Sequence, residues 1–558
     1  MSAIFRLSGW NIQSPCRLMP SEGAFPVTPF SLSTRFVSAS LGCGICLLIA
    51  LGGAARAQTP SATAPDKPIS AIDWLSDTLD APRAPATSAP QPSDIAQNAL
   101  PEDVSVAPLD TPSPDAAGLL PSAVTGLPRD LWGASTATDL ARRITTISAR
   151  PDLLPASRRL LNTLVLAELN PPLQSQADGR LFLARIDALL SQGLLDEADA
   201  LMELAGLSSP AIFRRAFDTK LLLGTEDEAC ARLTHTPGLS PTLQARIFCL
   251  ARGGDWDAAA LTLETGEALG LIREDQGELL ARFLDPELFE GEPSLPIPDH
   301  PTPLTFRLME AIGEPLATSS LPLAFAQSDL RATTGWKARA TAAERLARVG
   351  ALSPNRWLGI WSEHLPAASG GIWDRIEALQ RFETALSTND PGAVSHALPP
   401  AWSAMRVSGL QPVFAELFAA RLALLPLNGE AADIAFEVAL LSPDYEKIAT
   451  KWAPALSRDQ AFLKGIAMGD LPTQRPSTDM ARAIATGFRG TGVPVRLTSL
   501  VSEQRLGEAI LRAIEVLEGG AAGDIDELSD ALQFFRAVGL EATARRAALE
   551  LMLLERRG

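Results

Sequence analysis

Histidine is scarce in this sequence, and the few copies present are poorly placed for metal binding. None of the four has a second histidine four residues away or a local cluster of cysteine and aspartate; they are His235, His300, His364 and His396. A protein zinc site needs three or four such ligands brought close together. The sequence therefore predicts no metal site.

Familiar catalytic motifs are lacking as well. The chain has no Gly-x-Ser-x-Gly nucleophile elbow and no Ser-x-x-Lys set with its companion motifs. The loop at residues 487–492 is rich in glycine but lacks the lysine and the spacing of a phosphate-binding loop, so we interpret it as a connection that ends a helix. We predict that the chain is not an enzyme and uses no cofactor.

Positive charge is in deficit. The chain has 48 lysines and arginines against 65 aspartates and glutamates, a formal net charge of −17. The first 57 residues carry four arginines and one glutamate, so the remainder carries −20. Nucleic acid and anionic membrane surfaces repel such a chain at long range, and neither is expected as a main partner.

The N-terminus contains the longest apolar run. Arg35 precedes this run at 36–54, and a small-x-small pattern ends at Ala57, which predicts cleavage before Gln58. We predict a signal peptide at 1–57, so that the mature chain is periplasmic or secreted and has no membrane span. The alternative is an inner-membrane anchor at 36–54, because the run approaches the roughly 20 apolar residues that span a bilayer.

Cysteine is almost absent beyond this leader. Three of the five cysteines lie within it, and only Cys230 and Cys249 remain. Two cysteines in an exported chain favour a disulfide, because an oxidising compartment preserves the bond. Two buried thiols are the alternative. The pair lacks the Cys-x-x-Cys spacing of redox-active sites, so we expect a structural role.

Residues 58–130 have the composition of a disordered, Pro/Ala-rich tether. They contain thirteen prolines and a single aromatic residue, and cannot bury enough apolar surface to offset the entropy of ordering. A short helix is nevertheless predicted near 70–80. We expect it either to bind a partner's groove or to pack back on the chain's own helices, through Ile72, Trp74, Leu75 and Leu79.

A short pattern recurs three times at intervals of 31 and 30 residues. In each copy a glycine is followed by alanine five positions later and by a large apolar residue nine positions later: Gly193, Ala198 and Met202; Gly224, Ala229 and Leu233; Gly254, Ala259 and Leu263. We expect the glycine to end one helix, the alanine to let the next helix approach, and the large residue to fill the groove between them. The period predicts stacked helical hairpins over 131–285.

These hairpins resemble tetratricopeptide-type repeats. Gly193, Ala198, Met202, Ala205 and Pro210 match the second half of that family's motif in type and spacing. The period is shorter than the family's, which is about 34 residues. The resemblance covers roughly 179–271, and it implies helical hairpins that hold peptides or partner proteins on a concave surface.

The hairpin interpretation also places the two cysteines. Cys230 follows Ala229 in a second helix, and Cys249 lies five residues before Gly254 in the next first helix. Neighbouring helices of stacked hairpins bring such positions within reach of a disulfide, which needs Cα atoms within about 7 Å.

Six prolines interrupt the helical pattern at 286–303, which predicts a break before a second all-α region at 304–558. Within that region Trp357 and Trp361 lie one helical turn apart and share a face. Exposed in a groove, they would anchor a peptide or a glycan. Core packing between hairpins is the alternative.

We therefore predict an all-α fold, an α-solenoid of stacked hairpins preceded by a signal peptide and a disordered linker. The expected function is that of an exported scaffold or binding protein that mediates protein–protein interactions in the cell envelope. The alternative is an accessory subunit, or a degenerate helical domain, of a cell-wall-processing enzyme.

Overall fold

The structure is a computed structural model that describes residues 74, 113–173, 179–452, 456–473 and 476–554. All of them belong to the second of two compact units, 65–558. The predicted signal peptide at 1–57 lies outside the described residues. So do Ile72, Leu75 and Leu79 of the predicted short helix.

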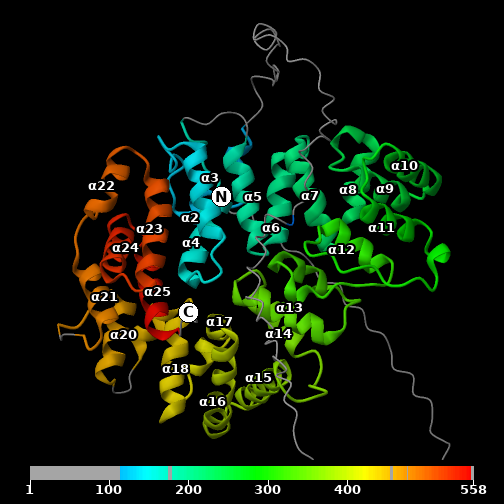
Figure 1. Cartoon of the computed structure of the whole chain (residues 1–558). Coiled ribbons are helices and arrows are strands. Elements are labelled where there is room, and N and C mark those ends of the chain that lie inside the picture. Colours follow the sequence, from blue (N-terminus) through cyan, green and yellow to red (C-terminus); the bar gives the residue numbers. More distant parts are fainter. Residues whose placement is uncertain (1–73, 75–112, 174–178, 453–455, 474–475, 555–558) are drawn as a thin grey trace, which may run out of the picture. The chain divides into compact units, whose positions relative to one another are not determined.

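The described part of the chain is all-helical (Figure 1). It contains no β-strand, and its one isolated parallel bridge joins Leu120 to Ala167. The first elements are η1 (Pro114–Ala116), α2 (Ser122–Thr125), α3 (Ala137–Ser148), α4 (Pro155–Leu166), α5 (Arg180–Ser191), α6 (Leu195–Ala205), α7 (Pro210–Leu223), α8 (Glu226–His235), η2 (Pro237–Leu239), α9 (Leu243–Arg252), α10 (Trp256–Ala268), α11 (Glu274–Leu284), η3 (Pro286–Phe289) and α12 (Pro303–Ala311).

The later elements complete the described fold. They are η4 (Thr318–Ser320), η5 (Leu323–Leu330), α13 (Trp336–Arg348), α14 (Pro354–Trp361), α15 (Ile372–Ser387), α16 (Pro391–Ser408), α17 (Gln411–Leu422), α18 (Glu430–Leu441), α19 (Tyr445–Lys451), α20 (Arg458–Met468), α21 (Asp479–Arg489), α22 (Val495–Ser502), α23 (Leu506–Ala521), α24 (Ile525–Ala537) and α25 (Glu541–Leu553).

Helices α5 to α11 pack in sequence, each against the next. The three repeat glycines lie between the paired helices α5 and α6, α7 and α8, and α9 and α10. Gly193, Gly224 and Gly254 have φ angles of 76°, 81° and 84°, in the left-handed region that glycine adopts without steric cost. The glycine therefore turns the chain between the two helices of each hairpin.

Backbone order begins before Leu131. Helices η1 and α2 lie inside the segment whose composition resembles a tether, and Asp115 of η1 is fully buried. The Asp115 carboxylate accepts the Phe182 amide at 2.7 Å, and its backbone carbonyl accepts the buried Arg185 guanidinium at 3.0 Å. These contacts attach η1 to helix α5. Proline content alone therefore underestimates how much of this segment is ordered.

Trp74 lies far from the other described residues in sequence, yet its side chain is buried. Its ring packs edge-on against Phe325 of η5, with the centroids 5.6 Å apart, and Phe325 packs in the same way against Phe306 of α12. Only 1% of the Trp74 surface is exposed. Trp74 therefore packs on the chain's own helices, which is one of the two expectations for this residue.

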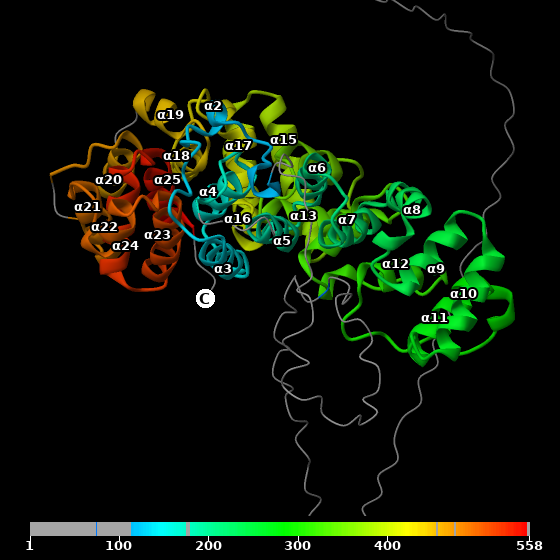
Figure 2. The same ribbon diagram turned by 90° about the horizontal axis from the view of Figure 1, so that it is seen from above.

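The first helices contact the last. Helices α3 and α4 pack against α23 and α25, and both views place these elements side by side (Figures 1 and 2). Arg143 of α3 donates to Glu515 of α23 at 2.8 Å, and the Gly507 amide donates to the Leu131 carbonyl at 2.8 Å. The first and the last helices of the described region therefore pack against each other.

Two hydrophobic cores follow from this arrangement. The first is shared by α3–α12 and α18–α25, and includes Leu161 of α4 and Leu549 of α25. The second is centred on α13–α17, and includes Trp357, Phe382 and Phe414. The region 304–558 contributes to both cores. Between η3 and α12 the chain runs without helix across the proline-rich segment.

Candidate functional site

The two cysteines meet as the repeat interpretation predicts. Cys230 of α8 and Cys249 of α9 form a disulfide, with their Cα atoms 5.0 Å apart. Both side chains are buried among neighbouring helices. The bond links two consecutive hairpins, which is a structural position rather than a reactive one.

The repeat residues form the interior of the hairpins. The alanines that allow close helix approach and the large residues that fill the grooves are all buried: Ala198, Met202, Ala229, Leu233, Ala259 and Leu263. They hold the helices together and offer no surface to a ligand.

Trp357 and Trp361 are core residues in this structure. Both have 0% exposed surface, and their ring centroids lie 4.9 Å apart. The Trp361 indole Nε1 donates to the Ala340 carbonyl at 3.1 Å. Their rings fill the second core, as the alternative interpretation of this pair expected, and present nothing to a peptide or a glycan.

A polar cavity lies beside the repeats, around the ion pairs of Lys220. It has a volume of about 330 Å³ and is lined by residues of α6, α7, α8, η5 and α14, among them Asp199 and Glu228, and by Arg331 directly after η5. The Lys220 ammonium lies 2.8 Å from Glu228, 3.1 Å from Asp199 and 3.3 Å from Glu203. These ion pairs of Lys220, a residue of α7, join α7 to α6 and α8.

Burial shapes the protonation of this cluster. Desolvation raises the pKa of Asp199, although the hydrogen bond and charge of Lys220 act in the opposite direction. Desolvation alone would lower the pKa of Lys220, but its hydrogen bonds to Glu228 and Asp199 outweigh burial and raise it. Lys220 therefore stays charged. The cluster is an ion-pair network that holds helices together, and no general acid or base stands out in it.

An apolar pocket opens where α17, α18 and α19 meet; we call it the α17–α19 pocket. Its volume is about 410 Å³, within the range of small-molecule sites. It is lined by Ala420, Leu422, Ala423, Leu424, Leu425, Pro426, Leu427, Ala432, Ala435, Asp444, Lys447, Ile448, Lys451 and Trp452.

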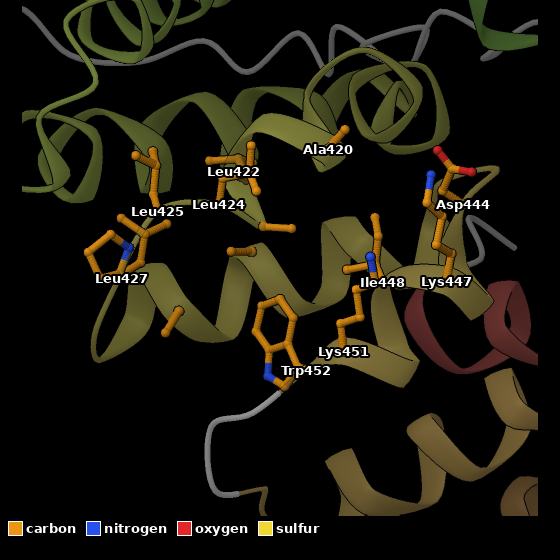
Figure 3. A pocket seen from close by; sticks show the side chains of 14 residues that line it. Ala420, Leu422, Leu424, Leu425, Leu427, Asp444, Lys447, Ile448, Lys451 and Trp452 are labelled. Atoms are coloured by element: carbon orange, nitrogen blue, oxygen red, sulfur yellow. The ribbon is translucent and has the colours of Figure 1, made fainter.

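The two ends of this pocket differ in chemistry (Figure 3). Four leucine side chains, Leu422, Leu424, Leu425 and Leu427, gather at one end, and the charged side chains of α19 lie at the other. The pocket thus has an apolar end and a cationic end, the latter offset by a single carboxylate, Asp444.

The local sequence explains this arrangement. Helix α17 ends at Leu422, and the chain then crosses to α18 through a leucine-rich loop that contains Pro426, which has no amide hydrogen to extend the helix. Helix α19 carries Lys447 and Lys451 four residues apart, hence on one face. Tyr445 is buried and Glu446 pairs with Arg545 of α25 at 3.3 Å, which fixes the opposite face of α19.

Sequence reasoning missed this pocket, although one signal was present. The chain has only six lysines, and two of them are Lys447 and Lys451, which share a helical face with Ile448 and neighbour Trp452. A cationic pair beside apolar residues is unusual in so acidic a chain. The leucine-rich loop that completes the pocket gives no periodic signal of its own.

A second apolar surface lies on α10. Leu261 and Thr265 of this helix and Leu269, the C-cap residue that follows it, lie at four-residue spacing, and all three are exposed. Leu261 is 65% exposed and Leu269 is 67% exposed. We call this the α10 stripe. Leu271, just beyond the helix, is exposed as well.

Within the described ranges no group of three or more histidine, cysteine or acidic side chains is arranged to hold a metal ion. Among the helices that the structure describes, none combines the length and the apolar character required to cross a bilayer.

Comparison with known proteins gives no family for the chain: no protein-family model, curated protein or solved structure matches it.

Proposed function

We propose that this chain is an exported helical scaffold that binds protein partners in the cell envelope. Export is supported by the leader-like sequence at 1–57 and by the Cys230–Cys249 disulfide, a bond that persists in oxidising compartments. Cleavage before Gln58 leaves a periplasmic or secreted chain. The partner is a protein with an apolar surface of its own.

The α10 stripe is the observation that carries this proposal. In stacked hairpins the second helix normally buries its apolar residues against the hairpin or its neighbours. Helix α10 does so with Ala259 and Leu263, yet Leu261 and the C-cap residue Leu269 are exposed on another face. Exposed apolar side chains aligned on one helix are typical of protein-binding surfaces.

Site-specific photo-crosslinking in intact cells tests the proposal. A photoreactive side chain at Leu269 should give a defined crosslinked product with another protein. The same group at Lys337, an exposed position on α13, should not give that product. Leu261→Glu should remove the product, because it places a charge on the same stripe, about two helical turns from Leu269, without disturbing the core.

Two results would contradict the proposal. One is a Leu269 product that survives Leu261→Glu. The other is a product whose mass is that of two copies of this chain, since the stripe would then be a self-association surface. Sequencing the N-terminus of the isolated protein tests export separately, because an intact residue 1 would reject cleavage before Gln58.

A further inference from the structure

We infer that the α17–α19 pocket binds a single-chain amphiphile with an anionic head group, of the long-chain carboxylate class. This site is separate from the α10 stripe, and the inference does not depend on the proposed scaffold function. It rests on the apolar end of the pocket, on its cationic end and on the hydrogen bonding of the loop that forms the apolar end.

The apolar end suits a hydrocarbon chain. Leu422 and Ala435 are buried in the pocket wall, whereas Leu424 is 84% exposed at its edge. A solvent-exposed leucine next to a buried apolar wall leaves apolar surface in contact with water, and an acyl chain lying along it would remove that surface from water.

The cationic end suits an anionic head group. Lys447 and Lys451 are exposed, and neither makes an ion pair with a side chain in the described part of the molecule. Lys220 and Lys464, in contrast, are engaged: Lys220 by three carboxylates and Lys464 by the Trp452 carbonyl at 3.2 Å. These two ammonium groups outnumber the single carboxylate of Asp444 at the same end of the pocket, so this end carries a net positive charge that attracts a carboxylate.

The loop at the apolar end favours an acyl chain over a peptide. The amides of Ala423, Leu424, Leu425 and Leu427 already donate within the helix end and the loop, to Ala419, Arg421, Leu422 and Leu425. Pro426 has no amide hydrogen. A peptide bound here would find these backbone donors occupied, which leaves its own carbonyl groups desolvated, whereas a hydrocarbon chain needs no such partners.

Calorimetric titration of the purified full chain, with its disulfide intact, tests the inference. The two probes are dodecanoate and dodecyltrimethylammonium, each below its critical micelle concentration. They share a chain length and differ in the sign of the head group. Dodecanoate should bind about tenfold more tightly, because two ammonium groups favour the anion and oppose the cation.

Substitutions test the contribution of each end of the pocket separately. Lys447→Gln with Lys451→Gln should abolish the preference for dodecanoate, and both sites are exposed, so the fold should be retained. Lys337→Gln removes an equally exposed lysine on α13 and should leave the preference unchanged. Ala432→Phe fills the pocket from α18 and should weaken both probes; its melting curve checks that the fold persists.

Three outcomes would overturn the inference. They are equal affinity for the two probes, an unchanged preference in the double lysine variant, and no detectable binding of either probe. Tighter binding of an apolar peptide with a C-terminal carboxylate than of dodecanoate would also overturn the choice of an acyl chain. If the preference is unchanged in the double lysine variant, or if neither probe binds, the two lysines serve only the C-terminal end of α19, where positive charge is favourable in any helix.

Discussion

Lys220 is the side chain on which several repeat contacts converge. It belongs to α7, its side chain is 2% exposed, and its ammonium group reaches carboxylates on both α6 and α8. A buried charge is tolerated only where opposite charges compensate for its lost hydration. The three acidic residues are partly exposed, so the network lies at the boundary between the repeats and solvent.

Replacing Lys220 by methionine should destabilise the protein by about 2–3 kcal/mol. The substitution keeps most of the buried hydrocarbon but leaves Asp199 and Glu228 close together without their cation, while Glu203 keeps its ion pair with Arg232. Removing one partner is the costly way to break a buried ion pair. Urea denaturation measures the change in the free energy of unfolding.

Lys337→Met is the matched control for this substitution. Lys337 is an exposed lysine on α13, and its replacement should change the free energy of unfolding by less than about 0.5 kcal/mol. Equal effects of the two substitutions would show that Lys220 is not an organising contact.

At the scale of single elements, helix α4 lacks a capping side chain of its own. Its N-cap residue is Leu154, which has no side-chain acceptor, and the helix begins at Pro155. The acceptors come from the last helices instead: Glu518 of α23 accepts the Leu154 amide at 3.1 Å, and Glu550 of α25 accepts the Ala156 amide at 2.6 Å. Side chains some 360 residues or more away in sequence thus perform a role that is usually local.

Helix α23 is held close to the chain before α3 by a glycine. A Cβ atom added at Gly507 would lie 2.4 Å from the Trp132 ring and 3.0 Å from the Leu131 carbonyl. The small residue therefore permits the packing of α23 against residues 131–132. Trp132 is almost completely buried at this contact.

Gly507→Ala should therefore cost about 2 kcal/mol, because the Trp132 ring must move out of a packed core. Gly359→Ala is the matched control: Gly359 is exposed within α14, and a Cβ there meets nothing within 4 Å. That substitution should stabilise the protein by up to about 1 kcal/mol through helix propensity. Thermal unfolding of both variants checks the opposite signs, and a stabilising Gly507→Ala would refute the close contact.

The elements that could be predicted from sequence are those fixed by local chemistry. Gly193, Gly224 and Gly254 mark turns that need a left-handed backbone, and each turn occurs where the spacing indicates. The Gly-rich loop also ends a helix, since α21 stops at Arg489. The disulfide could be predicted because it joins two such hairpins.

Other elements could not be predicted from sequence, because tertiary packing overrides the local conformational preference of their residues. Pro399 and Pro400 lie inside α16, where proline ordinarily ends a helix. Leu398, Ala401 and Trp402 around them are buried in the second core, so tertiary contacts keep the helix continuous. The α17–α19 pocket likewise depends on how three helices meet, which their separate sequences do not specify.

At the scale of the whole described region, contacts between its first and last helices distinguish it from an open solenoid. In an open array each hairpin touches only its neighbours, and stability is roughly a sum over adjacent pairs. Here α3 and α4 share a hydrophobic core with α23 and α25. The loss of a stabilising contact in the first helices should therefore also destabilise the last helices.

Hydrogen exchange tests this coupling with the two glutamates that cap α4. Alanine at both Glu518 and Glu550 leaves the amides of Leu154 and Ala156 buried without acceptors, which should lower the free energy of opening by about 3 kcal/mol. Amides of α4 and of α23 and α25 should then exchange on the order of 100-fold faster, and together. Glutamine at both positions keeps an oxygen acceptor in place and should preserve most of the protection. If exchange accelerated in α23 and α25 while α4 kept its protection, the two ends would be independent, and the region would behave as an open stack of hairpins.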